Sequence, residues 1–317
     1  MKNLKLTVTT LLILISNFSH SEELDLRELP CFWFSEPENQ EIARYLERER
    51  EFSNYSWIYS ILSANSYVDE GLIIPLPDME NWVELGRVAD EDIEQGFFAR
   101  AWLRRRDSEN ELIISFRGTT SIWKDYANGN FALVPVLFGR TQFDSALDFT
   151  RTVLEEMQSK GYEYSKLVFT GHSLGGGLAQ YTQRFYHNSK AVVFDPSPNR
   201  GRIYSIFQNP PYRLNAVRVY EKNEILEYFR KALDPDLEWD WTPDGKGKST
   251  VWMDFYAGGS VEAHGINDLA TSLIRVAAST GNEEALSVIE DIENNMSNKP
   301  ELTCDQNVHR KALRGDI

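Results

Sequence analysis

Residues 167–180, LVFTGHSLGGGLAQ, constrain the fold of this chain more than any other stretch. An apolar, β-branched and aromatic run, typical of a buried strand, leads directly into Gly171-His172-Ser173-Leu174-Gly175, and helical spacing follows. Strand, sharp turn and helix in this order are the context of the G-x-S-x-G nucleophile elbow. Glycines flank the serine because larger side chains would collide with the neighbouring strand and helix. We therefore predict that Ser173 is a nucleophile and that the Leu174 amide faces a developing oxyanion; an ordinary turn is the alternative.

Strand and helix patterns alternate along the rest of the chain. We predict helices at residues 38–66, 143–160 and 266–278, and an elbow helix that runs to about residue 187. We predict strands at residues 97–105, 111–116, 166–170, 191–194 and 216–220, of which the first two form a β-hairpin. Residues 234–249 are predicted to form a surface loop. This alternation favours the α/β class, with a mostly parallel central sheet covered by helices on both faces.

The first 21 residues have the parts of a secretory signal peptide. Two lysines come first, residues 6–15 are apolar, and Ser19 and Ser21 are small residues placed for cleavage. The alternative, a membrane anchor, needs about 20 apolar residues. We therefore expect a secreted or periplasmic protein with a single catalytic domain at residues 22–300 and a polar tail at residues 301–317.

The charge of the chain excludes some partners. The formal net charge is −15, so the protein would repel the phosphates of nucleic acids and gains no electrostatic attraction to anionic membranes. Any contact with lipid must then be apolar, local and transient. The two cysteines, Cys31 and Cys304, either form a disulfide or remain separate thiols. Zinc-ligand spacing and glycine-rich phosphate loops are missing from the sequence, and we predict neither a metal nor a cofactor.

A hydrolytic serine needs a general base, and four histidines follow the signal peptide. His172 precedes the serine on the strained turn, where its ring is expected to point elsewhere. His187 lies fourteen residues along the predicted elbow helix, which is about 21 Å at 1.5 Å per residue. His309 falls in the polar tail. His264 remains, on a glycine-flanked loop before a predicted helix, and we predict it as the base.

The acid that orients this histidine should follow a strand between the serine and the histidine. Asp195 follows the strand at 191–194, and Glu224 follows the strand at 216–220. Either carboxylate can hold the imidazole tautomer and stabilise the imidazolium. Asp195 also suits a turn, and Glu224 also suits a surface position. The residues alone leave both candidates open.

Three motifs resemble the fungal-type (class 3) lipase family: FRGTTS at 116–121, GHSLGGG at 171–177 and RVYEKNEIL at 218–226. The resemblance runs from about residue 55 to about residue 270 and implies an α/β-hydrolase fold. It implies that Thr119, after the Arg-Gly pair, donates its amide to the oxyanion together with Leu174. It places Glu224 where the family has an aspartate, and so favours Glu224 over Asp195.

The resemblance implies a secreted serine carboxylic-ester hydrolase that acts on lipid esters through an acyl-enzyme, as a triacylglycerol lipase or a phospholipase A. Ser173, His264 and Glu224 are the expected catalytic residues, and Thr119 and Leu174 form the expected oxyanion hole. An aryl or feruloyl-type esterase is one alternative. A non-catalytic binding protein on a hydrolase scaffold is the other, because a glutamate replaces the usual acid.

Overall fold

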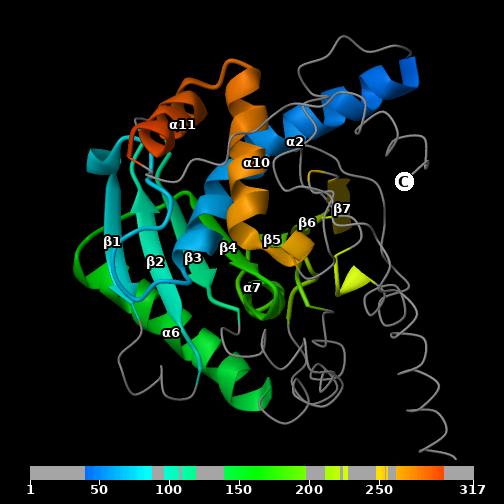
Figure 1. The fold of residues 1–317 in the computed structure, drawn as a ribbon. Coiled ribbons are helices and arrows are strands. Elements are labelled where there is room, and N and C mark those ends of the chain that lie inside the picture. Colours follow the sequence, from blue (N-terminus) through cyan, green and yellow to red (C-terminus); the bar gives the residue numbers. More distant parts are fainter. Residues whose placement is uncertain are drawn as a thin grey trace, which may run out of the picture.

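In the part of the chain that the computed structural model describes, seven strands form one central sheet (Figure 1). They are β1 (Trp82–Arg87), β2 (Ala99–Arg104), β3 (Glu111–Phe116), β4 (Lys166–His172), β5 (Ser189–Phe194), β6 (Ala216–Glu221) and β7 (Lys248–Met253), and they lie side by side in chain order. The pairs β1–β2 and β2–β3 are antiparallel, whereas each pair from β3 to β7 is parallel. The predicted hairpin and the predicted mostly parallel sheet are both confirmed.

The structure describes residues 40–87, 96–106, 109–118, 139–197, 211–221, 224–227, 248–253, 255 and 262–295. Several sequence predictions fall outside them: the signal peptide at 1–21, Cys31, Cys304, the expected oxyanion residue Thr119, His309 and the tail at 301–317. These points, and the extent of the catalytic domain at 22–300, stay predictions.

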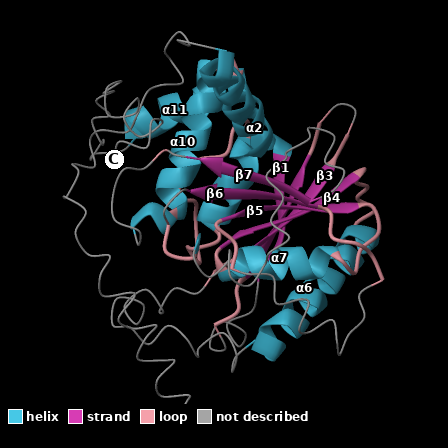
Figure 2. Ribbon diagram, turned by 90° about the vertical axis from the view of Figure 1, so that its right-hand side faces the viewer, coloured by secondary structure: helices cyan, strands magenta, loops and turns pink. Residues whose placement is uncertain are grey.

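Helices cover both faces of the sheet (Figure 2). One face carries α2 (Gln40–Asn65), α10 (Ile266–Ser279) and α11 (Glu283–Asn295), and the other carries α6 (Gly139–Ser159) and α7 (Leu174–Gln183). Two 3₁₀ turns, η2 (Met79–Asn81) and η3 (Glu262–His264), complete the described elements. Of the helices that the structure describes, none is both long and apolar enough to cross a membrane.

The parallel strands are apolar on both faces, so each strand contributes to two cores. On β3, Ile113 packs with α2 and α10, whereas Leu112 and Ile114 pack with α6 and α7. On β5, Val192 joins the first core and Val193 the second. This alternation follows from the two-residue period of a strand. Because β3 to β7 run parallel, their carboxyl ends meet at one edge of this doubly covered sheet.

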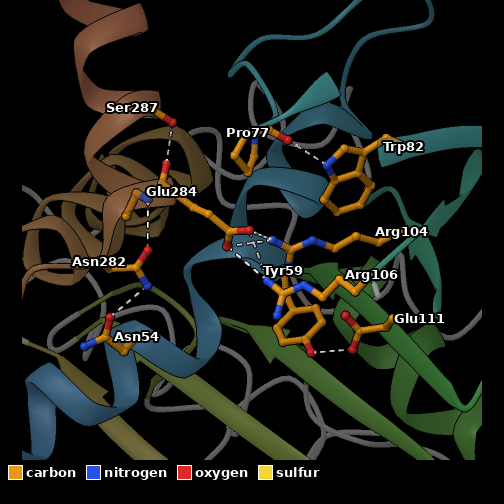
Figure 3. Close-up of polar contacts among 11 residues, drawn as sticks. Asn54, Tyr59, Pro77, Trp82, Arg104, Arg106, Glu111, Asn282, Glu284 and Ser287 are labelled. Carbon is orange, nitrogen blue, oxygen red and sulfur yellow. Dashed lines mark hydrogen bonds and ion pairs between the residues drawn. The ribbon is translucent and has the colours of Figure 1, made fainter. Parts of the chain in front are cut away.

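Polar contacts attach α11 to the antiparallel side of the sheet (Figure 3). The Glu284 carboxylate accepts hydrogen bonds from Arg104 Nη2 on β2 at 2.8 and 2.7 Å, and from Arg106 Nη2 at 3.2 and 3.0 Å. The Arg104 guanidinium also lies over the Trp82 ring, 5.1 Å from its centroid. Just before α11, Asn282 Nδ2 donates to Asn54 Oδ1 on α2 at 3.1 Å. One carboxylate therefore ties the last described helix to the second strand.

The structure also corrects some boundaries. The elbow helix ends at Gln183, because the next amides donate back three residues and close a turn; the prediction that it runs to 187 is wrong. The predicted loop at 234–249 is wrong at its end, since β7 begins at Lys248. The sequence also missed β1 and α11. In β1 the pairing register shifts between Glu84 and Gly86, which breaks the alternation that marks a strand.

Candidate active site

Ser173 occupies the sharp turn between β4 and α7 in a strained backbone conformation. Its φ of 56° and ψ of −123° lie in a region that residues other than glycine rarely adopt. The turn is held on both sides, since the Ser173 amide donates to the Phe194 carbonyl at 3.0 Å and the Ser173 carbonyl accepts from Gly177 and Ser197 at 3.2 and 2.9 Å. The Ser173 residue is only half-buried. The strand–turn–helix predicted for the nucleophile elbow is thus present, with its serine accessible.

Two glycines make this turn possible by allowing close approach. A Cβ on Gly175 would overlap the carbonyl oxygen of Phe116 on β3, and a Cβ on Gly171 would lie 2.5 Å from the carbonyl carbon of Gly175. Real Cβ atoms do not come this near to backbone atoms. The predicted reason for the glycines, collision with the adjacent strand and helix, is confirmed.

His264 and Glu224 meet in the interior beside this edge of the sheet. His264 ends η3 immediately before α10, and Glu224 follows β6. The distance from His264 Nδ1 to Glu224 Oε2 is 2.5 Å, and both side chains are fully buried. The same Oε2 accepts the Leu226 amide at 2.9 Å, which fixes the longer glutamate side chain against its own loop. The two residues that the sequence predicts as base and acid therefore form one hydrogen-bonded pair.

Asp195, the other candidate acid, lies close to the same histidine. It follows β5 with a φ of 38°, it is fully buried, and its Oδ1 accepts the Glu221 amide at 2.8 Å. One carboxylate oxygen of Asp195 and one ring nitrogen each of His172 and His264 lie within 4.8 Å of one another. Glu224, not Asp195, makes the hydrogen bond to His264 Nδ1.

His172 joins this cluster, so its ring lies beside that of the predicted base, His264. The ring centroids of His172 and His264 are 4.6 Å apart. His172 ends β4 two residues after Thr170, whose hydroxyl contacts Ser63 on α2 at 2.9 Å. Residues two apart on a strand share a face, so the His172 ring also points towards the α2 side.

Tyr67, which sequence reasoning missed, anchors the His172 ring. Its hydroxyl lies 2.8 Å from His172 Nδ1. Burial raises the pKa of Tyr67 strongly, and a backbone hydrogen bond from Gly118 and the nearby Arg117 charge lower it in part. The phenol is therefore protonated at neutral pH and links the end of α2, the elbow and the segment after β3. Its sequence signal is weak, because only the fold brings residue 67 to residue 172.

The structure describes one of the two residues that are expected to form the oxyanion hole. Leu174 is the first residue of α7, where an amide points out of the helix N-terminus. Thr119 lies outside the described residues, but Gly118 before it is described. A Cβ on Gly118 would lie 3.3 Å from the Ser173 Cβ and 2.7 Å from the His172 carbonyl oxygen. Gly118, the last described residue of this segment, therefore lies directly beside the serine.

His187 lies away from the elbow helix that was predicted to contain it. It is exposed, beyond the end of α7, and its ring centroid is 5.2 Å from that of Tyr212. Of the four candidate histidines, the structure thus gathers His172 and His264 into one buried cluster.

Comparison with known proteins matches part of the chain. A family model described as phospholipase-like, for the Tle-like phospholipase domain, matches residues 74–199, which contain β1 to β5 and the elbow. No curated protein sequence matches the chain.

The solved structures that resemble the chain are distant. The Lip2 lipase of Yarrowia lipolytica is 14% identical, with 68% of this chain and 80% of that chain covered and a TM-score of 0.39. Lipase II of Rhizopus niveus is 16% identical, with 57% and 74% covered and a TM-score of 0.38. The carboxylesterase EstE1, from a metagenomic library, is 12% identical, with 77% and 96% covered and a TM-score of 0.36. These likenesses are too weak to add to the geometry. The parallel sheet and the elbow give the chain an α/β-hydrolase fold, and residues 74–199 are similar to the phospholipase-like family.

Proposed function

We propose that this protein is a secreted serine hydrolase that cleaves the carboxylic esters of phospholipids. The observation that carries the proposal is the partly exposed Ser173 on a strained elbow, in the same part of the sheet as the buried His264–Glu224 pair. A strained, accessible serine and a histidine fixed by a carboxylate are the two parts that nucleophilic ester hydrolysis needs.

The proposed reaction proceeds through an acyl-enzyme. Ser173 Oγ attacks the ester carbonyl while His264 takes its proton. Because Glu224 holds Nδ1, the proton is received at Nε2, and the Glu224 carboxylate stabilises the resulting imidazolium. The amides of Leu174 and Thr119 stabilise the tetrahedral oxyanion. His264 then protonates the leaving alcohol, and a water molecule, activated by the same histidine, releases the fatty acid.

The phospholipid substrate is supported by two observations of different kinds. The matching family model is described as a phospholipase-like domain. The sequence also begins with a predicted signal peptide, which would place the enzyme outside the cytoplasm, near envelope lipids. Since the chain carries a net charge of −15, contact with an anionic bilayer would be local and apolar.

A non-catalytic scaffold was the alternative from a different class, because glutamate stands where the related lipases have aspartate. The contact at 2.5 Å between Glu224 and His264 weakens that alternative. The extra methylene is accommodated by the bond from the Leu226 amide, so the longer acid still reaches the ring.

The substrate is tested by comparing three ester classes. Purified protein is incubated with phosphatidylglycerol–phosphatidylethanolamine vesicles, a triacylglycerol emulsion and a feruloyl ester, and released acids are quantified by mass spectrometry. We expect fatty acid and lysophospholipid from the vesicles, at a rate at least tenfold above that with either other ester. Ser173→Ala should remove this release, whereas the control Ser165→Ala, at an exposed serine before β4, should retain it. Preferential hydrolysis of the emulsion or the feruloyl ester would contradict the phospholipid assignment.

A further inference from the structure

The geometry points to Asp195 as a positioning residue for His264: a second buried carboxylate whose charge adds to that of Glu224 in stabilising the imidazolium. This inference rests on the proposed function, in which His264 is the base. It differs from the proposed set of Ser173, His264 and Glu224 alone, because the hydrogen bond to His264 and the additional negative charge come from two different acids.

A turn role alone does not account for an aspartate at this position. Its Oδ1 caps the end of β6 by accepting the Glu221 amide at 2.8 Å. Asparagine would make the same bond and tolerates the positive φ of 38° equally well. An ionised carboxylate costs more to bury than an amide. A buried aspartate is therefore better explained by its charge than by its bond to the backbone.

The charge has a partner within range. A carboxylate oxygen of Asp195 and a ring nitrogen of His264 lie within 4.8 Å, and both side chains are fully buried. An opposite charge at about 4–6 Å favours the charged form of a group, and the effect is greater where water is excluded. When His264 takes the serine proton, the developing imidazolium thus faces carboxylates from two neighbouring strand ends.

Glu224 orients the His264 ring through a hydrogen bond, and Asp195 supplies additional negative charge. Oε2 of Glu224 accepts from both the Leu226 amide and His264 Nδ1, so the amide compensates part of its negative charge. Other titratable groups lie on the elements packed here: the imidazole of His172 on β4 lies beside the His264 ring, the phenol of Tyr67 contacts His172, and the Arg117 charge acts on Tyr67. The carboxylate of Glu221 on β6 accepts the Phe255 amide at 2.7 Å. Arg117 is itself paired with Asp69 at 2.8 Å. The Arg117 charge is thus already partly balanced.

Asp195→Asn tests the inference, because it keeps the backbone cap and removes the charge. The pH dependence of kcat/KM for a soluble short-chain p-nitrophenyl ester reports the titration of the base in the free enzyme. With one negative charge fewer, we expect the acid limb of this profile to move about one pH unit towards lower pH. The plateau should fall by up to about tenfold, because the imidazolium formed in the transition state is less stabilised.

Glu111→Gln is the matched control for a buried carboxylate. Glu111 begins β3 and accepts from the Tyr59 hydroxyl at 2.7 Å, about 17 Å of strand away from the elbow edge. The acid limb of the Glu111→Gln profile should stay within about 0.2 pH unit of the wild-type limb, since the Glu111 carboxylate is distant from His264. If Asp195→Asn failed to fold, Asp195→Ser would provide a second neutral variant with an oxygen acceptor.

The titration of His264 is also followed by NMR in the protein without substrate, which does not require catalysis. The same shift of about one pH unit between wild type and Asp195→Asn is expected there. Unchanged titration midpoints in a folded neutral variant would overturn the role of Asp195. An inactive wild type whose His264 midpoint still shifts would overturn the proposed function and leave the electrostatic coupling standing.

Discussion

Glu224 and His264 are 40 residues apart in the sequence, yet their side chains meet at 2.5 Å in the protein interior. The glutamate is one methylene longer than the aspartate of the lipases that the sequence resembles. The bond from the Leu226 amide to the same oxygen shows how the loop after β6 accommodates the extra length. Aspartate or glutamate can therefore orient this histidine, provided that the loop places the backbone of the longer residue farther from the ring.

Glu224→Gln should lower kcat by about 10⁴-fold with little change in the fold, because an amide can present its NH₂ group to Nδ1 and favour the wrong tautomer. Glu224→Asp should lose about 10²-fold, since the shorter side chain moves the carboxylate away from the ring. Steady-state kinetics with a soluble ester, alongside circular dichroism, measure both effects. A Gln variant as active as wild type would show that Glu224 is not the orienting acid.

Tyr67→Phe should reduce kcat by about tenfold and the free energy of unfolding by about 1 kcal/mol. The phenol contacts His172 Nδ1 at 2.8 Å and accepts from the Gly118 backbone, so its loss loosens the elbow and the backbone at Gly118 together. Tyr164→Phe, at an exposed tyrosine before β4, is the control and should change neither quantity. Equal kcat values for Tyr67→Phe and Tyr164→Phe would mean that the contact between Tyr67 and His172 does not contribute to turnover.

Gly175→Ala should destabilise the protein by about 3 kcal/mol or more, because the new methyl group would overlap the Phe116 carbonyl oxygen. The melting temperature should then fall by about 6–12 °C. Gly161→Ala is the control, since Gly161 has a φ of 65° but nothing within 4 Å of its Cβ position; it should cost only about 1–2 kcal/mol. Differential scanning fluorimetry compares the two, and equal losses would contradict the close packing of the elbow against β3.

Two arginines that share Glu284 should differ in their effect on stability. The Arg104 side chain is 7% exposed, and the Arg106 side chain is 51% exposed. Arg104→Gln should cost about 1–2 kcal/mol, because it removes a charged hydrogen bond from a mostly dry site. Arg106→Gln should cost less than about 0.5 kcal/mol, since water screens its ion pair. Urea denaturation curves measure the free energy of unfolding of both variants, and a larger loss for Arg106→Gln than for Arg104→Gln would contradict this order.

Local pattern and long-range geometry limit what could be predicted from the sequence. The elbow and β4 are continuous in the chain, and their glycines and apolar run mark them directly. By contrast, β1 contains a register shift, and β7 opens with Lys248-Ser249-Thr250, so neither has the alternation or apolar run of a strand. The sequence also missed α11, whose first turn is fixed by contacts with Arg104 and Asn54 that lie far away in the chain.

The site shows the same division. Elimination among the histidines selected His264, but Asp195 and Glu224 both follow strands of the same sheet and are equivalent by pattern. Their difference is set by how each backbone leaves its strand, with Asp195 turning at a φ of 38° to cap β6 and Glu224 reaching the ring. The position of His172 beside His264, and its contact with Tyr67, depend on which face of β4 is covered by α2, which the sequence does not indicate.

The most direct test of the central claim is the reaction of the protein with a fluorophosphonate probe, followed by intact-mass measurement and peptide mapping. Ser173 on its strained turn, with a histidine fixed by Glu224, should take up one probe per molecule, and the label should map to the peptide that contains residues 167–180. Ser173→Ala should take up none. Labelling at another serine, or no labelling of folded wild-type protein, would contradict the account.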